Sequence, residues 1–210
     1  MEASACLKNM LTSSTQVSYH AVICAAGAGT RMGKNKALCH LSDSETFLSS
    51  IVHALQKAGV DLIHVVIGAQ AEIVRDCHAH LHVNWVVNPE WASTYMLESL
   101  TLGVRNTPPH TGIIHWPVDC VGVHAEDIQK LIDAEPAPFA TLYFDGTPGH
   151  PLRIAPEKAD LLRTKSHNFA SLRDFFHSDD CIRVDAKFPA LMNCNDPQRL
   201  ADFIATHTQL

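Results

Sequence analysis

The feature that most constrains the fold is an alternation of short apolar runs with longer segments that carry apolar residues at helical spacing. The apolar runs occupy residues 19–26, 62–69, 82–89, 111–119 and 138–146. The segments with helical spacing occupy residues 46–60, 71–81, 93–106, 124–134 and 196–208. Strands that alternate with helices predict βαβ units, in which parallel strands form a sheet that helices cover.

The last third of the chain departs from this alternation. Residues 150–156 follow an Asp-Gly turn and are expected to pair antiparallel with 138–146. Residues 156–164 and 169–178 indicate two short helices, and 181–193 indicate one or two strands. We therefore expect an α/β fold whose sheet is mostly parallel and contains a late antiparallel hairpin.

The length of 210 residues fits one domain, which we place at residues 19–210. Residues 1–18 are expected to form an N-terminal extension, either flexible or a short helix outside the fold. Residues 1–20 contain no continuous apolar run, so no signal peptide is expected, and no run of 18 apolar residues occurs, so no membrane span is expected. The seven cysteines form no Cys-x-x-Cys pair, which favours free thiols in a reducing cytoplasm. The net charge of −6 disfavours sequence-independent binding of nucleic acid.

The loop after the first strand, AAGAGTRMGKNK (residues 25–36), is rich in glycine and then basic. Gly27 and Gly29 permit a positive φ and a close approach of the backbone to phosphate, and the loop amides can surround an anion. Ligands of such sheets bind at the carboxyl ends of the strands. The loops after Gly68 and at Asp119 are expected at that same edge, so the sequence predicts an anion site there.

Three ligands fit a loop of this kind to different degrees. A dinucleotide-binding turn is disfavoured because the glycine spacing is loose and the second strand ends in IGAQ, without an acid for the ribose. A P-loop is disfavoured because Ala28 replaces the first glycine and Asn35 replaces the hydroxyl that binds Mg²⁺. The third ligand is a nucleoside triphosphate that reacts at its α-phosphate, with Arg31 and Lys36 neutralising charge on the departing pyrophosphate.

This loop resembles the A-A-G-x-G-x-R-M-G-x-x-K signature of the MobA/MocA-like nucleotidyltransferases, which include the cytidylyltransferases and guanylyltransferases of molybdenum cofactor biosynthesis. The resemblance covers roughly residues 19–205. It continues in VVIGAQAE, VVNPEWASTYMLESLTLGV, WPVDCVGVHAEDIQKLI, DGTPGHPLRI and MNCNDPQRLADF. The chain departs from the family pattern at Tyr95, where glycine is common, at Cys120 and Val121, near which proline is usual, and at Asp196, where threonine is usual.

The resemblance implies a three-layer, Rossmann-like nucleotide-diphospho-sugar transferase fold and an Mg²⁺-dependent transfer of NMP from NTP, with release of pyrophosphate. Asp119 ends an apolar strand, where an unpaired carboxylate would be costly, and it is the first candidate for a metal ligand. The resemblance places the second ligand at Asn193 or Asn195 and leaves that choice open. Lys36 is expected to hold the phosphates, with Arg31 near the β- and γ-phosphates.

The other candidate residues contact the substrates. The candidates for nucleotide contacts, besides Arg31 and Lys36, are Ala25, Ala26, Gly27, Gly29, Gln70 and Ser99. His150, in the G-H-P turn, either contacts the acceptor or only braces the turn. In this family A-A-G accompanies cytidine nucleotides and A-G-G accompanies guanosine nucleotides, so Ala26 points to CTP. The G-H-P turn agrees, but the N-x-N ending is more like the guanylyl branch and points to GTP.

The acceptor that the resemblance suggests is molybdopterin, and the acceptor pocket is expected within residues 140–195. A sugar-1-phosphate nucleotidyltransferase on the same fold is the second enzyme hypothesis. A relative that binds NTP or a cofactor without turnover is the third. The oligomeric state does not follow from the sequence.

The fourteen histidines include an alternating set at His78, His80 and His82. Such a set can be imagined as a zinc site. These three residues span an expected junction of helix and strand, so they need not share a face. The favoured interpretation is a solvated surface.

Overall fold

The computed structural model describes residues 17–176, 180–190 and 192–207. Its seven strands form a single sheet in the order β3-β2-β1-β4-β6-β5-β7. The strands are β1 (Tyr19–Ala25), β2 (Ile63–Ile67), β3 (Asn84–Val87), β4 (Gly112–Pro117), β5 (Phe139–Phe144), β6 (Thr147–Ile154) and β7 (Cys181–Asp185). Only β6 runs antiparallel to its neighbours, β4 and β5. The expected hairpin is therefore confirmed, and it lies inside the sheet.

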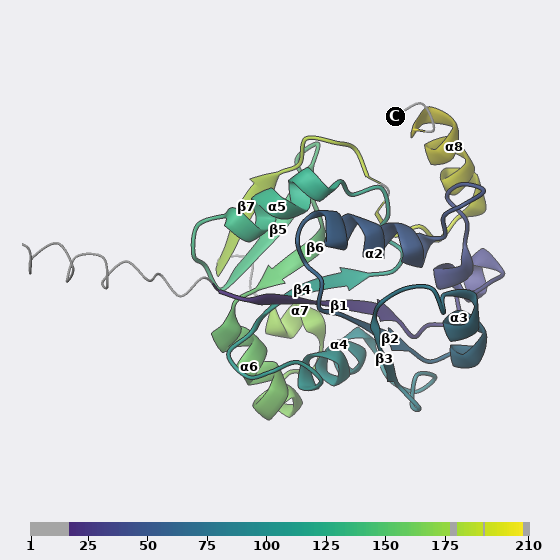
Figure 1. Cartoon of the computed structure of the whole chain (residues 1–210). Helices are drawn as coiled ribbons and strands as arrows, with labels where there is room; N and C mark the ends of the chain where they lie inside the picture. Colours follow the sequence, from purple (N-terminus) through teal and green to yellow (C-terminus); the bar gives the residue numbers. More distant parts are fainter. Residues whose placement is uncertain (1–16, 177–179, 191, 208–210) are drawn as a thin grey trace, which may run out of the picture.

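Helices cover both faces of the sheet (Figure 1). The α-helices are α2 (Phe47–Lys57), α3 (Ala71–Cys77), α4 (Met96–Arg105), α5 (Ala125–Asp133), α6 (Pro156–Lys165), α7 (Leu172–Phe175) and α8 (Pro197–His207). Three short 3₁₀ helices are η1 (Thr30–Met32), η2 (Lys36–Leu38) and η3 (Ser166–Asn168). Within the described residues, no helix is both long and apolar enough to span a membrane.

Two hydrophobic cores lie on opposite faces of the sheet. One core joins α2, α3 and α5 to the strands, with Phe47 and Ile128 fully buried. The other joins α4, α6 and α7 to the strands, with Leu100 and Phe139 fully buried. Because each face is covered, the central strands β1, β2 and β4 are buried along almost their whole length and do not alternate between buried and exposed residues. The three-layer arrangement expected from the sequence is confirmed.

The chain reverses its direction across the sheet next to β1. It passes outward from β1 through β2 to β3, and then returns so that β4 pairs with the other side of β1. Open α/β sheets bind ligands in the crevice that such a reversal leaves at the carboxyl ends of the strands. The loops that follow β1 and β4 meet at this crevice, and they are the loops at residues 25–36 and Asp119.

Some expected boundaries are wrong. The helix expected at 93–106 begins at Met96, with Tyr95 as its N-cap. Ser93 lies in the turn before this helix, where its hydroxyl donates to the Glu90 carbonyl. The helix expected at 71–81 ends at Cys77. Most of the expected N-terminal extension, residues 1–16, lies outside the described residues.

Candidate functional site

The glycine loop folds back on itself through two left-handed glycines. Gly29 (φ 67°) and Gly33 (φ 71°) flank the 3₁₀ turn η1. A Cβ on Gly29 would lie 2.1 Å from the carbonyl oxygen of Lys34, so the close return of the chain excludes a side chain there. Met32 is buried beneath the turn and anchors it to the core. The backbone after β1 is thereby held in a tight turn.

Asn35 fixes the end of this loop. Its side chain is 1% exposed, Oδ1 accepts from the Ala37 amide at 3.0 Å, and Nδ2 donates to the Ala69 carbonyl at 2.9 Å. The first bond caps η2 and the second ties the loop to the residues that follow β2. Sequence reasoning treated Asn35 only as a departure from the P-loop pattern and missed this role. An asparagine directly before a basic residue in a glycine loop was the available signal.

Lys36 meets two oxygen atoms from distant parts of the chain. Its Nζ donates to Asp119 Oδ2 at 2.7 Å and to Asn195 Oδ1 at 2.6 Å. The side chains of Lys36 and Asp119 are only 16% and 18% exposed. The Cys194 amide donates to the Asp119 carbonyl at 2.8 Å, so the chain segment before α8 is bound to the turn after β4. The structure thus brings together Lys36, Asp119 and Asn195.

These residues line a cavity of about 190 Å³ at the carboxyl ends of β1 and β4. Its lining residues are Cys24, Gly27, Gly29, Thr30, Arg31, Lys36, Met96, Val118, Asp119 and Asn195. Arg31 is exposed and lies on the rim. Thr30, Met96 and Val118 were not among the candidates from the sequence. A concave surface with two cations and a glycine backbone suits a polyphosphate.

Asn193 and Asn195 are directed to different cavities. Asn193 has a left-handed backbone (φ 53°) and lines a second cavity of about 640 Å³, whereas Asn195 lines the smaller one. Asn195 Nδ2 donates to the Asn193 carbonyl at 3.0 Å, which braces the tripeptide between the two cavities. The side chain that caps the start of α8 is that of Asp196, whose Oδ1 accepts from the Gln198 amide at 2.8 Å.

The larger cavity combines polar and apolar walls. Its lining residues are Thr141, Tyr143, Pro148, Gly149, His150, Leu152, Leu172, Arg173, Phe176, Cys181, Met192 and Asn193. Thr141 Oγ1 donates to the Gly149 carbonyl at 2.6 Å and fixes the turn that precedes His150. The exposed guanidinium of Arg173 is the cationic side chain in this lining.

His150 joins the two cavities through a buried contact. Its ring packs edge-on against that of His115 on β4, with the centroids 5.6 Å apart. His115 Nδ1 lies 3.9 Å from Cys24 Sγ, and Cys24 lines the smaller cavity. Burial lowers the pKa of His115 to about 3 and the pKa of His150 to about 4, although the carboxylate of Asp119 opposes the shift at His150. Both rings are therefore neutral near pH 7.

Other expected nucleotide contacts are not among the residues that line the small cavity. Gln70 is exposed and caps α3 with a left-handed backbone (φ 55°). Ser99 is buried and accepts from Asn88 Nδ2 at 3.1 Å, which stabilises the connection between β3 and α4. The Ala26 carbonyl accepts from the Ala69 amide at 2.9 Å, and Ala25 and Ala26 are buried at the end of β1. Gly27 and Gly29, in contrast, line the cavity.

The donors present suit a hard divalent cation. The Asp119 carboxylate and the Asn195 amide oxygen both lie within 2.7 Å of one ammonium nitrogen, so one small cation can contact both. Among the residues that the structure describes, no group of three or more His, Cys, Asp or Glu forms a metal site. A hard cation such as Mg²⁺ needs few protein ligands, because it keeps waters and phosphate oxygens.

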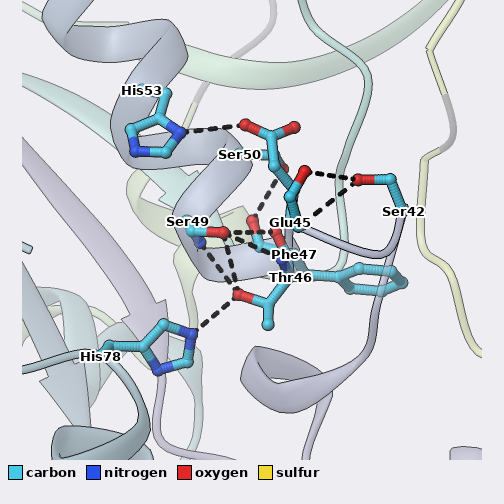
Figure 2. Close-up of polar contacts among 9 residues, drawn as sticks. Ser42, Glu45, Thr46, Phe47, Ser49, Ser50, His53 and His78 are labelled. Atoms are coloured by element: carbon cyan, nitrogen blue, oxygen red, sulfur yellow. Dashed lines mark hydrogen bonds and ion pairs between the residues drawn. The ribbon is translucent and has the colours of Figure 1, made fainter. Parts of the chain in front are cut away.

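The alternating histidines have separate roles. His78 is buried, with Nε2 2.7 Å from Thr46 Oγ1 (Figure 2) and Nδ1 2.8 Å from the Val74 carbonyl. It thereby connects α3 to the capping residue of α2. The expected solvated position is wrong for His78, because these two partners hold it in the core. His80 and His82 are exposed, as expected.

Comparison with known proteins assigns the chain to a family. The model of the MobA-like NTP transferase domain matches residues 21–182. A nucleotidyl transferase from Methanothermobacter is 24% identical, with a TM-score of 0.73 over 90% of this chain and 98% of that one. Rv0371c from Mycobacterium tuberculosis is 18% identical, with a TM-score of 0.74 over 90% and 99%. A 4-diphosphocytidyl-2C-methyl-D-erythritol synthase from Anaerococcus prevotii is 15% identical, with a TM-score of 0.72 over 93% and 98%. The structure of Rv0371c with manganese is also similar, at 18% identity and a TM-score of 0.68 over 90% and 99%.

Proposed function

Because the chain belongs to the family of MobA-like NTP transferase domains and is a nucleotidyltransferase, we propose that it transfers NMP from an NTP to a small phosphorylated acceptor with the help of Mg²⁺. The observation that carries this proposal is the pair of hydrogen bonds from Lys36 to Asp119 and Asn195. It joins the glycine loop, the end of β4 and the segment before α8 at the crevice where such sheets bind nucleotides.

In this proposal the triphosphate lies along the glycine loop. The loop backbone approaches the phosphates closely, and Arg31 and Lys36 neutralise their charge. A phosphate oxygen of the acceptor attacks the α-phosphorus, the bond from that phosphorus to the bridging oxygen of the β-phosphate breaks, and pyrophosphate leaves with the electron pair. Asp119 and Asn195 would hold Mg²⁺, which when bound would neutralise charge on the phosphate oxygens.

We assign the acceptor to the larger cavity. The tripeptide from Asn193 to Asn195 separates the two cavities, so an acceptor in the larger one reaches toward the α-phosphate in the smaller one. Neutral His150 and Asn193 offer hydrogen bonds to its phosphate, and Arg173 offers a charge near the opening. Leu172 and the other apolar residues of this lining suit an acceptor with an apolar or planar body. Molybdopterin is the acceptor that we favour, and CTP is the nucleotide substrate that we favour.

Pyrophosphate release tests the proposal. The full chain is incubated with Mg²⁺, each of the four NTPs, and either molybdopterin or a set of sugar 1-phosphates. We expect release with CTP and molybdopterin, and a loss of about a hundredfold or more in kcat for Asp119→Asn, because the substitution removes charge at the metal. Asp43→Asn, at an exposed carboxylate far along the loop before α2, is the matched control and retains the activity.

Other outcomes identify the competing functions. Faster release with sugar 1-phosphates would identify the chain as a sugar-1-phosphate nucleotidyltransferase. Thermal stabilisation by an NTP, without pyrophosphate from any acceptor, would indicate a binding protein without turnover. Equal activity of Asp119→Asn and the unchanged protein would contradict the assigned metal ligand.

A further inference from the structure

The ammonium group of Lys36 already contacts the two oxygen atoms that the proposed function assigns to the metal ion. It lies 2.7 Å from Asp119 Oδ2 and 2.6 Å from Asn195 Oδ1, and the lysine side chain is largely enclosed. These are hydrogen bonds of short, charge-assisted length. Lys36 therefore serves as a counter-ion to Asp119 and orients the Asn195 amide oxygen toward the same point.

The same two oxygens are the metal ligands in the proposed function. Mg²⁺ binds oxygen at about 2.0–2.1 Å. An ion that contacts both oxygens would occupy nearly the position of the lysine nitrogen, and a divalent and a monovalent cation so close repel each other strongly. Lys36 and the metal cannot both hold Asp119 Oδ2 and Asn195 Oδ1.

The surroundings allow the lysine head to move while its backbone stays. Asn35 fixes the backbone on one side of Lys36 through the Ala37 amide and the Ala69 carbonyl. The Lys36 side chain is long, and it lines the same cavity as Gly27 and Gly29. A triphosphate on those glycines is an anion within reach of the ammonium group.

We propose that Lys36 is a resident cation that exchanges between the metal ligands and the triphosphate. It holds Asp119 and Asn195 in place, and it moves onto the phosphates when the nucleotide and its metal bind. A consequence is that a divalent cation alone binds weakly, because it must displace the lysine with no anion to receive it. Metal and nucleotide then favour each other's binding, as two ligands with a positive coupling free energy do. This inference rests on the proposed function for the identity of the metal ligands.

Binding of Mn²⁺ without nucleotide tests the exchange. Free Mn²⁺ is measured by electron paramagnetic resonance as it is titrated into the full chain. Lys36→Met keeps an unbranched side chain, one atom shorter, and removes the charge, so we expect the variant to bind one Mn²⁺ at least about tenfold more tightly than the unchanged protein. Lys34→Met removes an exposed cation two residues away and is the matched control, with an expected change below about twofold.

The double variant Lys36→Met with Asp119→Asn identifies the site, because it should lose the gained affinity. Circular dichroism checks that each variant is folded, and Lys36→Gln replaces Lys36→Met if the latter unfolds. The proposal would be overturned if the Lys36 variant bound Mn²⁺ with the same affinity as the unchanged protein. Tight binding that persists in the double variant would overturn it as well. The Mn²⁺ titration needs no turnover. An absence of transferase activity would therefore contradict the proposed function but would not change the outcome of the titration.

Discussion

At the scale of single residues, the shape of the glycine loop depends on Asn35. One side chain both caps η2 and ties the loop to Ala69, and it is almost fully buried. Asn35→Ala leaves the Ala37 amide and the Ala69 carbonyl without these partners. We expect the free energy of unfolding to fall by about 1–3 kcal/mol, the usual cost of an unsatisfied buried polar group. Urea denaturation followed by circular dichroism measures this change.

Asn35→Ser is the informative companion variant, because serine completes the last position of the P-loop pattern. A serine hydroxyl is shorter and cannot make both hydrogen bonds, so we expect a loss of stability and weaker NTP binding. Asn106→Ala is a matched control: Asn106 is exposed and donates to Leu102, and its loss should change stability by only about 0.5 kcal/mol. Tighter Mg-NTP binding by Asn35→Ser would instead support the P-loop interpretation.

At the scale of secondary structure elements, α4 packs closely against the sheet because Gly103 has no side chain. A Cβ on Gly103 would lie 2.3 Å from Val22 Cγ1 on β1 and 2.9 Å from Val66 Cγ2 on β2. Glycine inside a helix is unfavourable by about 1 kcal/mol relative to alanine. The close approach of helix and sheet is therefore the reason for this glycine.

We expect Gly103→Ala to destabilise the protein by about 1–3 kcal/mol, because overpacking outweighs the gain in helix propensity. Chemical denaturation of Gly103→Ala, Val22→Ala and the double variant forms a double-mutant cycle. The smaller side chain at Val22 makes room for the new methyl group, so the double variant should be more stable than the sum of the single changes by about 1 kcal/mol. Additive effects, or a more stable Gly103→Ala, would show that the helix can move away without cost.

At the scale of the whole molecule, the order of strands and helices could be predicted from the sequence. The spacing of apolar residues indicates which face of each element is buried. The strands and helices were expected near their observed positions, and the antiparallel pairing of β5 with β6 was expected from the Asp-Gly turn. The insertion of β6 between β4 and β5 was not expected, since it depends on how a late hairpin packs against distant strands.

The candidate site could also be predicted only in part. Lys36 and Asp119 could be placed at one edge of the sheet, because both follow parallel strands or their loops. The choice between Asn193 and Asn195 could not be made, because it depends on the left-handed backbone at Asn193 and on the hydrogen bond that braces the tripeptide. The hydrogen bonds from Asn35 to Ala69 and between His78 and Thr46 could not be foreseen either, since each joins residues more than thirty positions apart in sequence.

The stability of the whole molecule should depend on buried neutral histidines. Burial lowers the pKa of His115 to about 3 and the pKa values of His64 and His150 to about 4. In the unfolded chain these groups titrate near 6.5, so between that pH and their folded values the unfolded state binds more protons. The free energy of unfolding therefore falls as the pH drops below about 6.5, by at most about 1.4 kcal/mol per pH unit for each histidine.

Urea denaturation at pH 7, 6 and 5 measures this slope and stays above the range in which ordinary carboxylates titrate. Burial also lowers the pKa values of His20 and His78, so these two residues contribute to the same slope. In His115→Gln the slope between pH 6 and 5 should therefore fall by at most about 1.4 kcal/mol per pH unit, the contribution of one histidine. The comparison uses the slope, so a variant that is less stable at every pH remains informative. A slope that is unchanged in His115→Gln would mean that this buried ring accepts no proton on unfolding, and the pH dependence would then have to arise from other groups.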